Sequence, residues 1–473
     1  MSQIMPDNGY ISSGPDRISS SRRSVLRLMS TAAVLPLLDA CDDDEKKPIL
    51  AGHRTPVLAT REGLTVEAGK SPPPVTVPVA QTVSNWPQSG RLPSHIGANY
   101  AWPGQQKQLW SRSVGAGVSE PDLLAWAALG SSGRGVIQAA PVVSNGRIFT
   151  MDAAGLVRAW TWPGMQRLWQ MRLKPSKLRS SNLGGGLGVD GDTLYIVDGV
   201  GQAIAADVAT GKEKWRVDIG SPGRSAPTIA EGRVYLGTID ERFFALDAAT
   251  GKQVWTFASM PTDTVTFGQP AAAVVDGVVL AGFGSGDLVA LRADSGEVVW
   301  SDTLGSINGQ ASALDFACIR SMPVIVDRTA YAMSVSSVMV AVDMRSGRRL
   351  WERAIAGQNA ILAVDEWLFI ITLGQQVACI DRLSGQIRWL TQLRAWENVD
   401  SQKGTVTWTG PVLAGGKLVV VSSLPENGIA TLDPSTGKIL SIGPLSSPVP
   451  VQPIVVDGRL LLLDDAGNLS AYG

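Results

Sequence analysis

The sequence predicts an all-β fold, an eight-bladed β-propeller built from four-stranded blades. Three observations lead to this prediction. A turn motif recurs along the chain. Its copies lie roughly 40–50 residues apart, which is the spacing of four-stranded propeller blades. A strand near the N-terminus supplies the piece that the last repeat lacks. We therefore expect one ring over residues 106–473, with its last blade closed by the N-terminal strand.

The repeated motif reads Ala-x-Asp-x-x-Thr-Gly followed by a Trp, and one complete copy runs from Ala245 to Trp255. The apolar run before Asp247 is typical of a strand. The Asp side chain accepts hydrogen bonds from the turn amides, and Gly251 takes the positive φ that such a turn needs. Two copies are imperfect, because Arg292 replaces the Asp in one and Leu440 replaces the Trp in the other.

The Trp of each motif is expected on the outermost strand of its blade, where its ring packs against the neighbouring blade. A chain with fifteen Trp residues could also stack carbohydrates, but their fixed position after the turn favours a structural role. The predicted blade tryptophans are Trp110, Trp169, Trp215, Trp255, Trp300, Trp351 and Trp389.

Eight repeat units can be counted, and each opens with a Pro or a small or apolar residue followed by a short apolar strand. They begin at Pro141, Gly188, Pro227, Pro270, Pro323, Ile361, Pro411 and Pro453. The eighth unit stops at Gly473 before a turn and a Trp strand, and residues 108–114 have the pattern of that missing strand. A ring closed in this way has no exposed edge in its last blade, whereas a linear solenoid would keep one.

The first 40 residues are predicted to be a signal peptide. Arg22, Arg23 and Arg27 precede an apolar stretch of residues 28–38, which is too short to span a bilayer as a lone helix. The following Leu-Asp-Ala-Cys resembles a lipobox, so we expect cleavage before Cys41 and its lipidation. An ordinary signal peptide and twin-arginine export both remain alternatives. Asp42 leaves open whether the anchor is in the inner or the outer membrane.

Residues 41–105 are predicted to be a Pro-rich tether and N-terminal extension, because residues 71–78 contain four prolines in an extended pattern. His95 lies in this region and is expected to pack in a loop rather than bind a ligand. Only one other histidine, His53, is present, so a His-based metal site or a Ser-His pair within the repeats is excluded.

Charge and cysteine content narrow the function further. The formal net charge is −1, which argues against a nucleic-acid partner. Apart from Cys41, the chain has only Cys318 and Cys379, which we expect to be buried free thiols; their spacing alone cannot support a disulfide.

The motif resembles the repeat of pyrroloquinoline quinone (PQQ) dehydrogenase propellers, a resemblance that indicates the fold rather than a function. The lipoprotein-type signal, the eighth blade at the end and the segment Asn85-Trp86-Pro87-Gln88 make the chain similar to the BamB family in its α-proteobacterial form. Members of this family are propeller lipoproteins of the outer-membrane β-barrel assembly machinery. The resemblance implies a non-catalytic scaffold without cofactor or metal, lipid-anchored on the periplasmic face of the outer membrane.

The same resemblance implies two kinds of partner: the central barrel subunit of the machinery, and unfolded outer-membrane protein clients. In the family, docking uses connections between blades, which match residues 264–269 and 313–320 here by blade order. The Leu/Arg cluster and paired Asp residues of enterobacterial members are not reproduced, because Cys318 and Arg320 stand at the aligned Asp positions. The contact residues expected here are Phe267, Gln269, Asp315 and Arg320.

Two other functions remain as alternatives. One is a periplasmic binding or sensor propeller of another pathway, which partner identity would distinguish. The other is a PQQ-dependent dehydrogenase, which needs Ca²⁺ held by clustered carboxylates and amides, and a catalytic Asp. Enzymes of that group usually have a vicinal Cys pair, and no two Cys are adjacent in this sequence.

Overall fold

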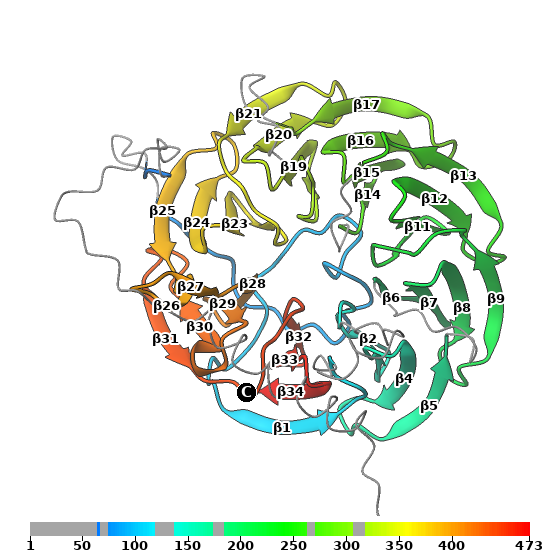
Figure 1. The fold of residues 1–473 in the computed structure, drawn as a ribbon, viewed down its shortest axis with the longest axis horizontal. Coiled ribbons are helices and arrows are strands. Elements are labelled where there is room, and N and C mark those ends of the chain that lie inside the picture. Colours follow the sequence, from blue (N-terminus) through cyan, green and yellow to red (C-terminus); the bar gives the residue numbers. More distant parts are fainter. Residues whose placement is uncertain (1–63, 67–73, 119–136, 174–183, 263–269, 306–316) are drawn as a thin grey trace, which may run out of the picture. The chain divides into compact units, whose positions relative to one another are not determined.

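The computed structural model describes residues 64–66, 74–118, 137–173, 184–262, 270–305 and 317–473. Residues 64–473 form one compact unit. Eight four-stranded antiparallel sheets stand in a ring within it, so the prediction of an eight-bladed β-propeller is confirmed (Figure 1). Cys318 and Cys379 are buried thiols that form no disulfide, as expected. In the described part of the chain, no helix is long and apolar enough to cross a membrane.

Blades 1 to 4 follow the chain in order, and their strands pair from the innermost to the outermost. Blade 1 contains β2 (Val142–Ser144), β3 (Arg147–Met151), β4 (Leu156–Thr161) and β5 (Arg167–Arg172). Blade 2 contains β6 (Gly185–Asp190), β7 (Thr193–Asp198), β8 (Gln202–Asp207) and β9 (Glu213–Asp218). Blade 3 contains β10 (Thr228–Ala230), β11 (Arg233–Gly237), β12 (Arg242–Asp247) and β13 (Gln253–Ala258). Blade 4 contains β14 (Ala273–Val275), β15 (Val278–Gly282), β16 (Asp287–Arg292) and β17 (Val298–Thr303).

Blades 5 to 7 repeat this order. Blade 5 contains β18 (Val324–Val326), β19 (Thr329–Met333), β20 (Met339–Asp343) and β21 (Arg349–Arg353). Blade 6 contains β22 (Leu362–Val364), β23 (Trp367–Ile371), β24 (Gln376–Asp381) and β25 (Ile387–Gln392). Blade 7 contains β28 (Trp408–Ala414), β29 (Lys417–Ser422), β30 (Ile429–Leu432) and β31 (Ile439–Gly443), with the short 3-10 helix η3 (Pro425–Asn427) before β30. A two-stranded ribbon, β26 (Trp396–Asn398) and β27 (Lys403–Thr405), precedes blade 7.

Blade 8 is assembled from both ends of the described chain. Its inner strands are β32 (Ile454–Val456), β33 (Arg459–Leu463) and β34 (Asn468–Tyr472), and its outermost strand is β1 (Gln108–Ser113). β1 pairs antiparallel with β34, with Ser111 opposite Ser470. Figure 1 shows the cyan β1 outside the red strands of this blade. The predicted closure of the last blade by an N-terminal strand is therefore confirmed.

The turn motif has the predicted geometry. Oδ1 of Asp247 accepts hydrogen bonds from the Thr250 amide (2.9 Å) and hydroxyl (2.6 Å), and Gly251 has a φ of 73°. At Asp207, Asp343 and Asp381 the turn is built in the same way. The turn lowers the pKa of the Asp247 carboxyl, because the Thr250 hydroxyl and amide both donate to the carboxylate.

Each Trp at the end of a motif links its blade to the next one. Nε1 of Trp215 donates to the carbonyl of Ala248, the residue after the motif Asp of blade 3, at 3.0 Å. The Trp215 ring covers Gly251, where an added Cβ would lie 2.6 Å from ring atoms. The same Trp-to-next-turn hydrogen bond is made by Trp169, Trp255, Trp300, Trp351 and Trp389. Trp110 instead packs against Trp162 of blade 1, with ring centroids 6.2 Å apart.

The hydrophobic core is divided around the ring, because each blade buries both of its faces. One cluster joins blades 2 and 3 through residues such as Tyr195, Val234 and Phe244, and six further clusters lie between the other neighbours. The inner strands therefore read as continuous apolar runs, whereas outer strands such as β13 bury the motif Trp between exposed neighbours.

Residues 83–100, the inner segment, run around the channel at the centre of the ring (Figure 1). This part of the predicted tether is packed on the propeller: Trp86 and Tyr100 within it and Trp102 just after it are all at most 5% exposed. Its backbone forms hydrogen bonds with the innermost strands of six blades. The Gln88 side chain bonds to blade 3, and the Val83 carbonyl bonds to blade 8. The bonds join Trp86 to Val143, Pro87 to Val189, Gln88 to Ile229, Pro93 to Val274, Ser94 to Ile325, Gly97 to Ala363, Tyr100 to Leu413 and Val83 to Asp457.

His95 lies in the inner segment and is 5% exposed. One ring nitrogen, Nδ1, is 2.7 Å from the carbonyl oxygen of Pro323 in blade 5. Burial lowers the pKa of His95 from 6.5 to about 4, and the bond to Pro323 only partly opposes this effect. The imidazole is therefore neutral in the folded protein at physiological pH and packs in a loop.

Unpairing β1 should destabilise the ring. Replacing residues 108–113 with a Gly/Pro linker of equal length removes the partner of β34, so we expect the melting temperature to fall by more than about 5 °C. Adding a second copy of β1 after Gly473, through an Asn-Gly turn, should restore it, because β1 and β34 are antiparallel and Gly473 lies beside Lys107. An unchanged melting temperature in the linker variant would contradict closure by β1.

The contact between Trp215 and Gly251 can be tested with a matched pair of substitutions. Gly251→Ala should destabilise the protein by about 1–3 kcal/mol more than Gly232→Ala, because only the first methyl group meets a ring. Gly232 has nearly the same φ, 71° against 73°, and nothing lies within 4 Å of its added Cβ. Backbone strain is thus common to both variants. Equal losses in urea denaturation would show that the ring does not constrain this glycine.

The neutral His95 predicts a pH dependence. The folded pKa of His95 is lower than the unfolded one, so its contribution is complete above pH 6.5 and is lost as the pH falls towards 4. Between pH 7 and pH 5 the wild type should lose about 2 kcal/mol more of its unfolding free energy than His95→Gln. Urea titrations of both proteins at the two pH values measure this difference, and parallel losses would refute it.

Candidate functional site

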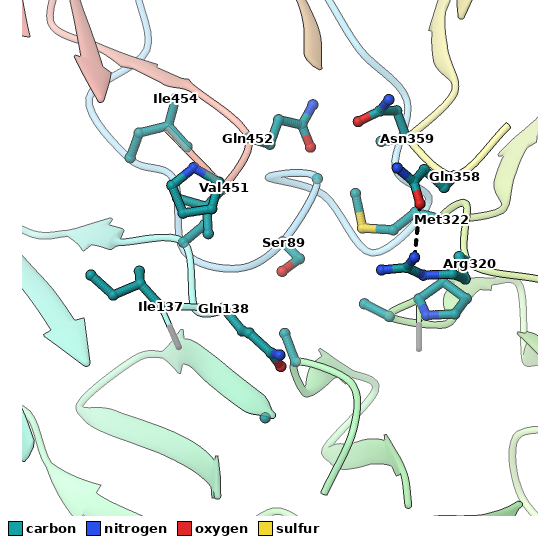
Figure 2. Close-up of a pocket in the computed structure, with 18 of the residues that line it drawn as sticks. Ser89, Ile137, Gln138, Arg320, Met322, Gln358, Asn359, Val451, Gln452 and Ile454 are labelled. Carbon is teal, nitrogen blue, oxygen red and sulfur yellow. Dashed lines mark hydrogen bonds between the residues drawn. The ribbon is translucent and has the colours of Figure 1, made fainter. Parts of the chain in front are cut away.

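A cavity in the central channel has a volume of about 380 Å³. The inner segment forms one side of it with Trp86, Ser89 and Gly90. The other lining residues come mainly from connections that lead into the innermost strands, such as residues 137–140, 320–322 and 358–360. The central cavity therefore lies at the end of the channel where the chain enters each blade, and its walls come from blades distant in sequence (Figure 2).

Arg320 is the one predicted partner-binding residue that the structure describes. It lies in the connection into β18, lines the central cavity and donates from Nη1 to Oε1 of Gln358 at 2.8 Å, as Figure 2 shows. Phe267, Gln269 and Asp315 lie outside the described residues, as does Cys41. Ala271 of the connection into β14 also lines the cavity, so both predicted docking connections lead into residues of this site.

The charge of Arg320 is not balanced within the described part of the site. Burial lowers the pKa of the Arg320 guanidinium, and the positive charge of nearby Arg224 acts in the same direction. Among the described residues, the structure records no carboxylate within salt-bridge distance of Arg320. A guanidinium still remains protonated at neutral pH, so the cavity wall carries a positive charge here.

Arg224 also lines the cavity, but it has a buried acidic partner. Its Nη1 lies 3.0 Å from Oε1 of Glu241, and both side chains are only 2% exposed. The second oxygen of Glu241 accepts a hydrogen bond from the Gly284 amide at 2.7 Å, so the pair joins blade 3 to blade 4. Burial raises the pKa of Glu241, although the Gly284 amide and Arg224 both favour the charged form. The pair has a structural role, because removing one partner would leave the other as an unpaired buried charge.

Amide side chains complete the polar lining. Asn359 donates to the carbonyl of Trp408 at 2.9 Å, which fixes its position beside the cavity. Figure 2 shows the polar ends of Ser89, Gln138 and Gln452 directed into the cavity from three different elements. Amide and hydroxyl groups both donate and accept hydrogen bonds, so these side chains suit a polar ligand.

The fold resembles quinoprotein propellers, so we tested the cavity for the calcium and quinone of those enzymes. That group needs carboxylates clustered around a Ca²⁺ ion. None of the described lining residues is acidic, and the described residues contain no group of three or more His, Cys, Asp or Glu that could hold a metal ion. The residues present therefore do not fit that cofactor.

Sequence reasoning missed most of this site. The sequence did not indicate a role for four of its residues, because each is a single polar residue in a different connection: Gln138, Arg224, Gln358 and Gln452. The only shared signal is their place, two to four residues before the apolar run that opens a blade. An alignment of all eight connections on their innermost strands would show this shared position and thereby identify the four residues.

Comparisons with known proteins agree with the fold and specify the family. The family model of outer membrane protein assembly factor BamB matches residues 153–391, half of the chain. An outer membrane protein assembly factor BamB from Yersinia pestis is 24% identical over 377 residues, which are 77% of this chain and 88% of that protein.

Solved structures show the same fold. The crystal structure of BamB from Moraxella catarrhalis superposes with a TM-score of 0.62 at 21% identity, covering 77% of this chain and 98% of that one. A quinohemoprotein alcohol dehydrogenase from Comamonas testosteroni gives a TM-score of 0.59 at 14% identity and covers 81% of this chain and 77% of its own. Because both enzymes and assembly factors share the ring, the fold does not decide the function. The match of the family model does decide the family: the chain belongs to the BamB family of outer membrane protein assembly factors.

Proposed function

We propose that this protein is a non-catalytic scaffold subunit of the outer-membrane protein assembly machinery. It docks on the central barrel subunit and helps the insertion of β-barrel clients. The observation that carries the proposal is the BamB family match over half of the chain, with a curated relative aligned over 88% of its length. The names of these relatives describe them as outer membrane protein assembly factors.

The geometry suits a scaffold. The Trp–Gly contacts tie neighbouring blades, and β1 and the inner segment close the ring, so the connections project from a stiff support. We place the docking surface on the connections into β14 and β18, with Phe267, Gln269, Asp315 and Arg320 as contacts. Docking sites on loops held by a rigid framework are common in proteins.

The proposed location is the periplasmic face of the outer membrane, with a lipid on Cys41 as the anchor. The basic, apolar and lipobox-like stretches of the first 41 residues support this location. In this arrangement the chain after Cys41 links the anchor to the propeller, on which Leu64 and Val75 already pack.

The proposal predicts the partners. The full-length tagged protein, extracted from its own membranes in a mild detergent, should recover the central barrel subunit in a pull-down read by mass spectrometry. Recovery of inner-membrane proteins alone would contradict the scaffold proposal and favour a sensor role in another pathway. A Cys41→Ser variant separates anchoring from docking: it should leave the membrane fraction and still bind the barrel subunit in solution.

The docking residues can be tested in the same experiment. The double variant Phe267→Ala/Asp315→Ala should lower recovery of the barrel subunit about tenfold, because contacts at the centre of an interface carry most of its energy. Arg345→Ala is the matched control. Arg345 is exposed in the turn between β20 and β21, which the alternation of antiparallel strands puts at the other end of blade 5 from the docking connections. Undiminished recovery with the double variant would exclude these connections as the docking surface.

A further inference from the structure

We propose that the central cavity is a binding site for a carboxylate group, which the Arg320 guanidinium holds while the surrounding amides hold the polar remainder of the ligand. This inference does not depend on the scaffold role, because it rests on the cavity alone. The site shares Arg320 with the proposed docking surface, but the ligand enters the channel between the connections.

The first observation is the state of Arg320. Its one recorded hydrogen bond is to the neutral amide of Gln358, although a guanidinium has five donors in a planar fork. No carboxylate among the described residues pairs with it. Within the same site, Arg224 by contrast has a buried acidic partner, Glu241, at 3.0 Å. Arg320 is thus a partly buried cation whose remaining donors suit an added anion.

The second observation is the lining around Arg320. The described lining residues include no acid, and Arg224 is already paired with Glu241, so Arg320 gives the cavity wall a positive charge that attracts anions. A carboxylate matches the guanidinium fork in two parallel hydrogen bonds. Gln138 and Gln452 reach the cavity from blades 1 and 8, across from Arg320, where they can pair with amide or hydroxyl groups of the ligand.

The third observation is the shape of the site. The inner segment closes one side of the cavity and pairs with every blade, so a ligand enters from the end where the connections lie. A volume of about 380 Å³ is within the range of small-ligand pockets, about 300–1,000 Å³. It accommodates an acidic side chain with a few flanking atoms, or a free small dicarboxylate. Both sources present the same chemistry to Arg320.

Calorimetric titration of the purified protein with two pairs of probes tests the proposal. The peptide pair is acetyl-Gly-Gly-Glu-Gly-Gly-amide and its Gln counterpart, and the free pair is glutarate and its diamide. We expect the acid of at least one pair to bind, and at least tenfold more tightly than its neutral analogue. Binding of the peptide alone identifies a polypeptide source, and binding of glutarate alone identifies a free metabolite. No binding of either acid at millimolar concentration would overturn the proposal.

Two variants localise the binding. Arg320→Gln should weaken the acid at least tenfold, whereas Arg345→Gln at the other end of blade 5 should leave it unchanged. Ser89→Asp is an independent test if Arg320→Gln folds poorly. It places a carboxylate from the protein itself beside the site, so it should abolish binding. Ser89→Asn, of similar size and neutral, should retain it. Equal affinity in Arg320→Gln and wild type, or in Ser89→Asp and Ser89→Asn, would show that the acid binds elsewhere.

Discussion

The ring depends on hydrogen-bond partners for the backbone groups at the inner edge of each blade. An innermost strand pairs on one side only, and its remaining backbone groups face the channel, where they need partners. The inner segment supplies them. It pairs through its backbone with the innermost strands of blades 1, 2, 4, 5, 6 and 7, through Gln88 with that of blade 3, and with the turn after β32 of blade 8. One irregular stretch thereby joins all eight blades and also forms a wall of the central cavity.

The outer part of the ring is held by a different and local device. Each motif Trp reaches the turn of the next blade, donates to a carbonyl there and lies on a glycine. A side chain at that glycine would displace the ring, so the Gly and the Trp of successive blades depend on each other. The turn of blade 1 between β4 and β5 places no glycine under the ring of Trp110 from blade 8, and Trp162 of that turn contacts the ring instead.

The sequence predicted what is encoded locally. The hairpin turn depends on Asp247, Thr250 and Gly251, which lie within five residues, so its geometry could be read directly. The blade count and the role of β1 followed from repetition. The inner segment could not be recognised in the same way, because its prolines resemble those of a free tether and its partners lie up to 374 positions away, as between Val83 and Asp457. The central cavity is equally non-local, since each connection contributes at most three residues and no connection forms a motif.

The position of β1 also bears on how the protein folds. Tyr472 and Gln108 meet across 364 positions of the chain, so the first of the described strands pairs with the last of them. During synthesis, blades 1 to 7 can form in turn, while β1 has no partner until β34 has emerged. Closing so long a loop is slow compared with forming a hairpin. The unpaired β1 and the open edge of the growing ring are thus exposed together for most of the synthesis, and a chaperone that protects either one would shield the step at which this propeller is most prone to aggregate.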